Sequence, residues 1–289
     1  LMASVKDLRD QIRSLKNTQQ ITKAMKQVAA AKIRRAEAAQ KQARPYAETL
    51  GEMLRELVGA VSRIDHPFMN PGNTSAPSGM ILMTADKGLC GAFNANVIRQ
   101  GESFLREHPG AVMYSVGVKA RQAVRRLGGG DHPSWPLNSA SKLEAAREVA
   151  RMASAAFVEG KISEIVLVSS KMLSMLVQRP QTLALVPIAR EGISADAAAS
   201  GPKAMVEFAP TPEAVLSQLL PKYLEFTIFS AMLETDAAFF AAQLVAMNNA
   251  TDNAGKLIDE YTIQMNNARQ AAITKELLEI VGGAEALNG

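Results

Sequence analysis

The chain has 289 residues, of which 47% are hydrophobic and only 5% aromatic, with a net charge of +4. This composition excludes a disordered chain and favours helices built from aliphatic residues. The single cysteine, Cys90, excludes an intramolecular disulfide and a cysteine-based zinc site, and the three histidines lack metal-ligand spacing. We expect no metal, no membrane-spanning stretch and no signal or transit peptide.

The charges are unevenly distributed along the chain. Residues 1–44 contain eleven Lys and Arg against three Asp and Glu, whereas residues 212–289 contain four against ten. Opposite charges predict that the two ends of the chain attract each other, with some bases left over for acidic partners. A basic first segment is also typical of nucleic-acid-binding proteins, so that alternative stays open here.

The first 44 residues predict one long helix. Ser4 and Asp7 have the spacing of a capping box. Apolar residues then recur at intervals of three and four, as in a coiled-coil seam. We expect Pro45 to kink or end the helix, although residues 46–58 could continue it. Residues 1–60 are therefore assigned to an N-terminal coiled-coil helix.

The middle of the chain alternates between strand-like and helix-like patterns. Predicted strands cover residues 80–84, 111–116, 164–169 and 182–188, and predicted helices cover 93–106, 118–127 and 141–158. Ser141 and Glu144 have the spacing of a second capping box at the start of the last of these helices. Such alternation indicates βαβ units around a partly parallel sheet. We expect residues 77–210 to form a compact, Rossmann-like α/β domain.

A second long helix is predicted after this region. Thr211-Pro212-Glu213 is a strong helix start, and Gly282-Gly283 is the expected end. A break or bend is expected in the polar stretch 248–255. Residues 211–289 are assigned to a C-terminal coiled-coil helix, which pairs antiparallel with the first and projects beyond it. The expected fold is thus α+α/β, a long antiparallel coiled coil with an inserted α/β domain.

No candidate active site emerges from the sequence. The loop 86–91 lacks the Gly-Lys-Ser/Thr ending of a P-loop and the glycine pattern of a dinucleotide site. Cys90 has no histidine nearby and is expected to be buried. By contrast, residues 266–276 combine amides, Arg, Gln and Thr near a helix end, which suits a surface that meets changing polar partners.

Five segments together resemble one known family. They are residues 18–32, 44–46, 88–91, 250–253 and 273–284, spread in order from end to end. The family they resemble is the gamma subunit of rotary (F-type) ATP synthase, bacterial type. Each match alone is weak, but the ordered set is specific.

The resemblance implies an architecture and a function. The coiled coil reaches into a ring of three alpha and three beta subunits, and the α/β domain forms a foot with the epsilon subunit on the proton-driven c-subunit ring. The chain then has no catalytic residue, cofactor, small-molecule substrate or nucleic acid. It transmits torque as a peripheral protein on the cytoplasmic face of the bacterial plasma membrane.

The resemblance also carries over individual residues. Ala209 stands where relatives often have Glu, so Glu207 or Phe208 is expected to contact the membrane ring. Gln243 stands where relatives often have Arg, which puts one ionic contact in doubt. The expected contacts with the alpha and beta subunits are Lys23, Met25, Lys26, Gln243, Arg269, Gln270, Thr274 and Glu276.

Two other classes remain as alternatives from the residues alone. A coiled-coil nucleic-acid binder would use residues 1–44, and a small α/β enzyme would carry the long helices as arms. Strong salt-dependent DNA affinity would favour the first, and nucleotide binding would favour the second.

Overall fold

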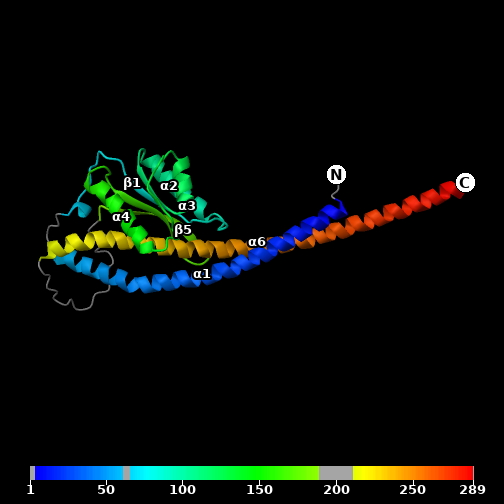
Figure 1. The fold of residues 1–289 in the computed structure, drawn as a ribbon, viewed down its shortest axis with the longest axis horizontal. Helices are drawn as coiled ribbons and strands as arrows, with labels where there is room; N and C mark the ends of the chain where they lie inside the picture. Colours follow the sequence, from blue (N-terminus) through cyan, green and yellow to red (C-terminus); the bar gives the residue numbers. More distant parts are fainter. Residues whose placement is uncertain (1–3, 61–65, 189–210, 289) are drawn as a thin grey trace. The chain divides into compact units, whose positions relative to one another are not determined.

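The computed structural model describes residues 4–60, 66–188 and 211–288 (Figure 1). The chain divides into two compact units. One combines the residues up to Ala30 with those from Gln243 onward, and the other comprises Ala31–Ala242. Both long helices contribute to both units, so each unit is described separately.

Helix α1, Val5–Ala60, runs through Pro45. Of the two outcomes left open for this residue, the helix continues beyond it. A proline inside a helix costs about 3 kcal/mol. Beyond it, Leu50, Leu54 and Leu57 are buried, at 4%, 0% and 0% exposed. Each such burial stabilises the fold by about 1.5–3 kcal/mol, so packing of the second half outweighs the proline.

Helix α6, Pro212–Asn288, is continuous through residues 248–255, where a break was predicted. The helix persists because polar side chains of this stretch bond to α1, as described below. It also continues past Gly282 and Gly283, contrary to prediction. Two glycines each cost only about 1 kcal/mol relative to alanine, which does not by itself end a helix.

The three predicted hydroxyl caps are confirmed. Ser4 and Asp7 bond reciprocally, each backbone N–H donating to the other's side-chain oxygen at 3.2 Å. The Glu144 N–H donates to Ser141 Oγ at 3.3 Å, ahead of helix α4. Thr211 Oγ1 accepts the N–H three residues on, also at 3.3 Å. These local signals fix where three helices begin.

The unit 31–242 contains one five-stranded sheet in the order β3-β2-β1-β4-β5. Strands β3, β2, β1 and β4 are parallel neighbours, and β5 joins β4 antiparallel. The elements are β1 (Gly79–Met83), α2 (Phe93–Glu107), β2 (Val112–Val116), α3 (Val118–Arg126), β3 (Ser134–Trp135), α4 (Lys142–Val158), β4 (Ile165–Met172) and β5 (Gln178–Val186), with a 3-10 turn η1 (Pro67–Met69) before them.

The predicted strands and helices of this region are confirmed, with ends shifted by a few residues. The largest shift is in β5, which begins at Gln178 because it pairs with β4 along its full length in a hairpin. Strand β3 was not predicted, since two residues are too short to show a pattern.

Apolar side chains cover both faces of the sheet. Met80 and Leu82 of β1 pack with α2 and α3, whereas Ile81 and Met83 pack with α4 and with parts of the long helices. Burial on both faces explains why β1 is a continuous apolar run. The compact unit therefore extends beyond residues 77–210. From the long helices, the cluster around Ile81 takes in Leu54, Leu57, Leu216, Leu220, Leu224 and Ile228.

Within the described residues, one helix is long and apolar enough to cross a membrane by length and composition, namely the Glu213–Gly283 part of α6. Its most apolar window is 67% buried inside the fold. Such burial is typical of a core helix in a folded protein, so the length and composition of this helix are only weak evidence for a membrane span.

Candidate interaction surface of the helix pair

In the unit formed by the chain ends, α1 and α6 pair antiparallel, as predicted. Gln19 Nε2 donates to the Thr251 carbonyl oxygen at 3.5 Å, and Thr251 Oγ1 donates to Thr22 Oγ1 at 2.8 Å. Further along α1, Lys26 Nζ donates to Asn248 Oδ1 at 2.5 Å. Residue numbers rise on one helix while they fall on the other, which defines the antiparallel register.

We call these five residues, Gln19, Thr22, Lys26, Asn248 and Thr251, the polar layer. Thr22 is only 7% exposed, so its hydroxyl lies inside the pair. Any slip of one helix along the other would break the three hydrogen bonds that join α1 to α6, each worth about 0.5–1.5 kcal/mol. Buried polar pairs in a helical seam are a known way of fixing register.

Small residues bring the two helices close together beside the polar layer. Ala29 and Ala254 are 0% and 4% exposed. A Cβ added to Gly255 would lie 3.1 Å from Gln19 Nε2. The seam therefore combines close approach with specific hydrogen bonds, and large apolar side chains contribute less to it.

The predicted contact residues of α1 differ in accessibility. Lys23 is exposed, whereas Met25 and Lys26 are half-buried. Because the Lys26 ammonium already bonds to Asn248, part of its charge is used within the chain. Lys23 is thus the more accessible cation of the three positions, and contact with a partner remains a prediction.

The predicted contact residues of α6 separate into two groups. The Gln243 side chain is only 8% exposed, so it is largely enclosed within the chain. Arg269, Gln270, Thr274 and Glu276 are all exposed. The side chains of this second group are therefore accessible to a partner, and their contacts with the alpha and beta subunits remain a prediction.

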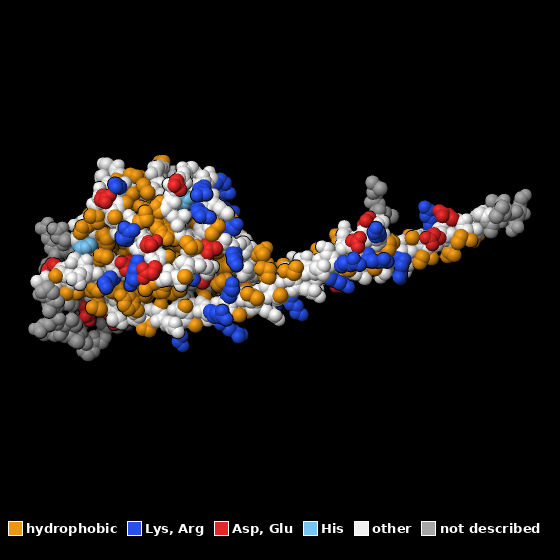
Figure 2. All heavy atoms as spheres, viewed as in Figure 1, with side chains coloured by type: hydrophobic (Ala, Val, Ile, Leu, Met, Phe, Trp, Pro, Cys, Tyr) orange, Lys and Arg blue, Asp and Glu red, His pale blue; other side chains and the backbone are white. Residues whose placement is uncertain are grey.

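Every side chain from Arg269 to Gly283 is exposed, as expected for a helix that outreaches its partner. Lys275 and Glu279 form an ion pair along the helix at 3.7 Å. Hydrophobic side chains are visible along this end of α6 in Figure 2. The large apolar residues here, 49–68% exposed, are Ile273, Leu277, Leu278, Ile280 and Val281.

The predicted ring contacts, Glu207 and Phe208, and the neighbouring Ala209 lie outside the described residues. Their role therefore remains a prediction from the resemblance.

The loop after β1 has a structural role that the sequence did not reveal. Asp86 Oδ1 accepts the N–H groups of Val118 and Leu137, both at 3.0 Å, and Oδ2 accepts that of Asn138 at 2.8 Å. One carboxylate thereby ties three segments together. Gly117, with φ of 95°, lies nearby, and a Cβ there would clash with the Thr84 carbonyl oxygen.

Cys90 is buried, as predicted, at 4% exposed. Its Sγ accepts a hydrogen bond from Asn94 Nδ2 at 3.3 Å. Burial raises the pKa of the Cys90 thiol, against smaller opposing contributions from backbone N–H groups, that of Asn94 first, and from the charge of Lys119. A raised pKa lowers the thiolate fraction at neutral pH, which fits a packing role and disfavours a nucleophile.

A buried ion pair fastens α6 to α4 within the unit 31–242. Lys142 Nζ lies 3.3 Å from Asp236 Oδ2, with side chains 18% and 12% exposed. Burial raises the pKa of Asp236, and Lys142 opposes that rise. Asp236 Oδ1 is buried without a hydrogen-bond partner, and the charged form of Asp236 is stabilised mainly by Lys142, with a smaller contribution from Lys32.

Comparisons with known proteins agree with this architecture. Residues 4–287 match the protein-family model described as ATP synthase, which defines the class. The chain is 41% identical to the ATP synthase gamma chain of Heliobacterium modesticaldum and 42% identical to that of Desulforamulus reducens. In both cases the alignment covers 99% of this chain and 100% of the relative. The chain therefore belongs to the ATP synthase gamma chain family, as the five motifs predicted.

Solved structures share the fold. A chain of the Euglena gracilis mitochondrial ATP synthase has a TM-score of 0.70 at 21% identity, covering 98% of this chain and 94% of that one. A chain from the central stalk and c-ring of the Tetrahymena thermophila mitochondrial ATP synthase has a TM-score of 0.59 at 22% identity, covering 80% and 99%. Nothing in these comparisons supports the nucleic-acid alternative.

Proposed function

We propose that the chain is the central rotor shaft of a proton-translocating ATP synthase. In that role it couples rotation of a membrane c-subunit ring to conformational changes in a catalytic hexamer of alpha and beta subunits. Full-length similarity to ATP synthase gamma chains supports this proposal. Solved structures that share the fold are described as belonging to the rotor and the central stalk.

The single observation that carries the proposal is the exposed end of α6. From Arg269 to Gly283 no side chain is buried, yet large apolar ones recur there. Contiguous exposed apolar side chains mark surfaces that bind partners. We infer that Arg269, Gln270, Thr274 and Glu276 meet the alpha and beta subunits there, together with those apolar residues.

The helix pair supplies the stiffness that a shaft requires. Force applied by surrounding subunits tends to slide one helix along the other. The polar layer opposes such sliding because its hydrogen bonds form in one register only. Lys23 and Met25 lie on this pair and are the proposed α1 contacts with a beta subunit. Lys26 joins them with the part of its charge that Asn248 leaves available.

In this proposal the chain performs no bond chemistry. An asymmetric shaft acts by making different contacts with each of three subunit conformations and so shifts their relative stabilities. The chain then needs no cofactor and no small-molecule substrate, and the nucleotides belong to its partners.

The α/β region is proposed to carry the epsilon subunit and to rest on the c-subunit ring through Glu207 and Phe208. This arrangement makes the chain a peripheral protein on the cytoplasmic face of the bacterial plasma membrane. The sequence similarity to bacterial gamma chains supports that location.

The test is reconstitution with matching alpha and beta subunits. We expect the chain to co-elute in gel filtration at one copy per six partners, and to raise multi-turnover ATP hydrolysis. Failure to co-elute, together with salt-dependent DNA binding by the chain, would instead support the nucleic-acid alternative.

A variant pair makes the test specific to the exposed end of α6. Leu278→Asp changes a side chain that is 67% exposed, and Val158→Asp changes one that is 58% exposed at the end of α4. We expect Leu278→Asp to weaken assembly and stimulation of hydrolysis at least tenfold, and Val158→Asp to retain both. Equal behaviour of the two variants would contradict the assignment of this surface.

A further inference from the structure

Four buried side-chain oxygens in the described part of the chain have no hydrogen-bond partner there. They are Ser139 Oγ, Ser169 Oγ, Thr235 Oγ1 and Asp236 Oδ1. Such groups are rare in native proteins, because each gives up its hydrogen bonds to bulk water when it is buried. Each of these oxygens therefore calls for a partner that the described residues do not supply.

The two oxygens of α6 lie where this helix passes the carboxyl ends of strands β1 and β4. Glu234 accepts the N–H of the last residue of β4 at 3.3 Å. Two residues on, Asp236 pairs with the first residue of α4 at 3.3 Å. Three residues further, Phe239 packs against Phe93, which opens α2 after the loop that follows β1, with ring centroids 6.1 Å apart. Thr235 is held among these contacts, at one end of the sheet.

The other two oxygens reach the same end of the sheet from β4 and from the loop before α4. Ser169 lies two residues after Leu167, which packs in the same apolar cluster as Met232 of α6. Because side chains alternate along a strand, Ser169 faces α6 as well. The residue before Ser139 donates its N–H to Asp86, three residues beyond β1, at 2.8 Å. The four oxygens therefore gather at one end of the sheet, on the side covered by α4 and α6.

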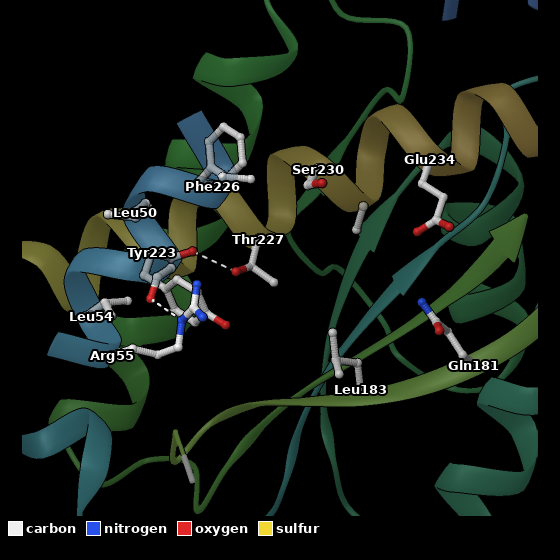
Figure 3. Close-up of a pocket in the computed structure, with 13 residues that line it drawn as sticks. Leu50, Leu54, Arg55, Gln181, Leu183, Tyr223, Phe226, Thr227, Ser230 and Glu234 are labelled. Atoms are coloured by element: carbon white, nitrogen blue, oxygen red, sulfur yellow. Dashed lines mark hydrogen bonds between the residues drawn. The ribbon is translucent and has the colours of Figure 1, made fainter. Parts of the chain in front are cut away.

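The Thr235 hydroxyl does not bond to its own helix. A threonine inside a helix can donate to the carbonyl oxygen three or four residues earlier. Thr227 and Thr262 of α6 do so, both at 2.7 Å, and Figure 3 shows the first of these bonds. Thr235 makes no such bond, although it is 0% exposed. Its hydroxyl is thus available to a partner between α6 and the sheet.

Water suits these oxygens better than a cation does. A water molecule both donates and accepts hydrogen bonds, so it can serve a carboxylate and hydroxyls together. A cation needs surplus negative charge. Asp236 and Asp86 provide two negative charges here, but Lys142 and Lys32 act on the same carboxylate and balance them. The described residues also contain no group of three or more acidic, histidine or cysteine residues that could hold a metal ion.

We propose that ordered water molecules bind between α6 and this end of the sheet. One joins Thr235 Oγ1 to Ser169 Oγ, and another joins Asp236 Oδ1 to Ser139 Oγ. We call them the buried water bridges. They attach α6 to β4 and to the loop before α4 through hydrogen bonds that the side chains do not make directly. This inference is independent of the proposed rotor function.

The direction of a stability change tests the first bridge. Thr235→Val keeps the shape of the side chain and removes its hydroxyl. Loss of a bridged hydroxyl should raise the unfolding equilibrium constant, measured by urea denaturation of the full-length chain, about fivefold. Removal of a hydroxyl that has no partner would instead lower this constant. A constant that stays the same or falls overturns the proposal.

Two combinations of variants identify the shared water. Ser169→Ala should also raise the constant about fivefold. The double variant Ser169→Ala/Thr235→Val should raise it by less than the product of the two factors, because both changes remove one bridge. Thr227→Val is the matched control, since the Thr227 hydroxyl bonds to its own helix. Its effect should be smaller, and it should multiply with that of Thr235→Val. Multiplicative effects of Ser169→Ala and Thr235→Val would overturn the bridge.

A direct count of bound water provides a second measurement. Magnetic relaxation dispersion of water deuterium counts the water molecules that stay bound to the full-length chain. We expect the count to fall by at least one in Ser169→Ala/Thr235→Val and to stay the same in Thr227→Val. An unchanged count in the double variant overturns the proposal.

A salt series separates water from a bound cation. The stability of the chain should be the same in sodium, potassium and choline chloride at equal ionic strength. Extra stability in sodium or potassium chloride that Thr235→Val removes would assign a cation and overturn the water bridges. Neither result bears on assembly with alpha and beta subunits, so it is distinguishable from failure of the rotor function.

Discussion

The unit 31–242 is dominated by two apolar clusters on the faces of a sheet. The helix pair of the other unit instead joins hydroxyls, an amide and an ammonium beside small residues, with Thr22 buried and the other polar side chains half-buried. Apolar clusters provide stability in proportion to buried area and tolerate small adjustments. A polar seam contributes less free energy but accepts a single register. The comparison indicates that packing in the unit 31–242 mainly stabilises the fold, whereas the polar layer mainly keeps α1 and α6 in one register.

The largest expected effect on stability lies in the unit 31–242, at the buried ion pair between Lys142 and Asp236. Lys142→Met leaves the Asp236 carboxylate buried without its cation, and we expect the free energy of unfolding at pH 7 to fall by about 3–5 kcal/mol. Urea denaturation measures this. The control is Lys161→Met, whose pair with Glu159 is 71% and 54% exposed and is worth at most about 1 kcal/mol.

The same variant has a pH dependence of known sign. Burial raises the pKa of Asp236 above its usual value of 3.8, and removing Lys142 removes an opposing contribution. The folded variant then holds a proton that the unfolded chain has released. Its stability should therefore fall as pH rises above about 4 and recover as pH is lowered. A destabilisation that does not change between about pH 4 and pH 7 would count against this origin.

The next effect concerns the apolar cluster itself. Leu54 is fully buried, so Leu54→Ala removes methyl groups and leaves a cavity, at a cost of about 2–5 kcal/mol. Its neighbour Met53 is 40% exposed. Met53→Ala should cost much less, and similar losses for both in thermal denaturation would mean that this part of α1 is not held by the core.

A smaller effect is expected in the polar layer. Thr251→Val keeps the side-chain shape but removes the hydroxyl that donates to Thr22, costing about 1 kcal/mol. Thr262→Val is the control, because the Thr262 hydroxyl bonds only to Ile258 of its own helix. Hydrogen exchange of α1 amides near Thr22 should accelerate in the first variant only. The double variant Thr22→Val/Thr251→Val should cost less than the sum of its parts.

The smallest effect is expected at the exposed end of α6. A Cβ at Gly282 meets no atom within 4 Å, so Gly282→Ala should increase helicity there, at up to about 1 kcal/mol. Gly88→Ala has equal space but lies outside any helix. A circular dichroism change in the Gly88 variant and none in the Gly282 variant would disagree with this view.

The sequence predicted those features that depend on neighbouring residues. The caps at Ser4, Ser141 and Thr211 and the apolar run of β1 are local signals, and all appear in the structure. The stretch 248–255 was mistaken for a break because its partners lie more than 200 positions away on α1. The polar composition of this stretch was evident from the sequence. The sequence alone could not show that side chains of α1 form hydrogen bonds with it.

The candidate contact residues follow the same division. Exposure of Arg269, Gln270, Thr274 and Glu276 agrees with the polar composition of that segment. The engagement of Lys26 by Asn248 depends on packing between distant segments and could not be anticipated. The anchoring role of Asp86 was hidden for the same reason, because its partners lie in segments 32 to 52 positions away.

The unpartnered end of α6 has a consequence for assembly. Isolated helices of about 12–15 residues are marginally stable in water, and this end buries no side chain within the chain. In the free chain it should fray and be the first site cut by a protease, and enclosure by partners should protect it. Part of the binding free energy is then spent on ordering the helix, so the measured affinity should fall below what the contact area suggests.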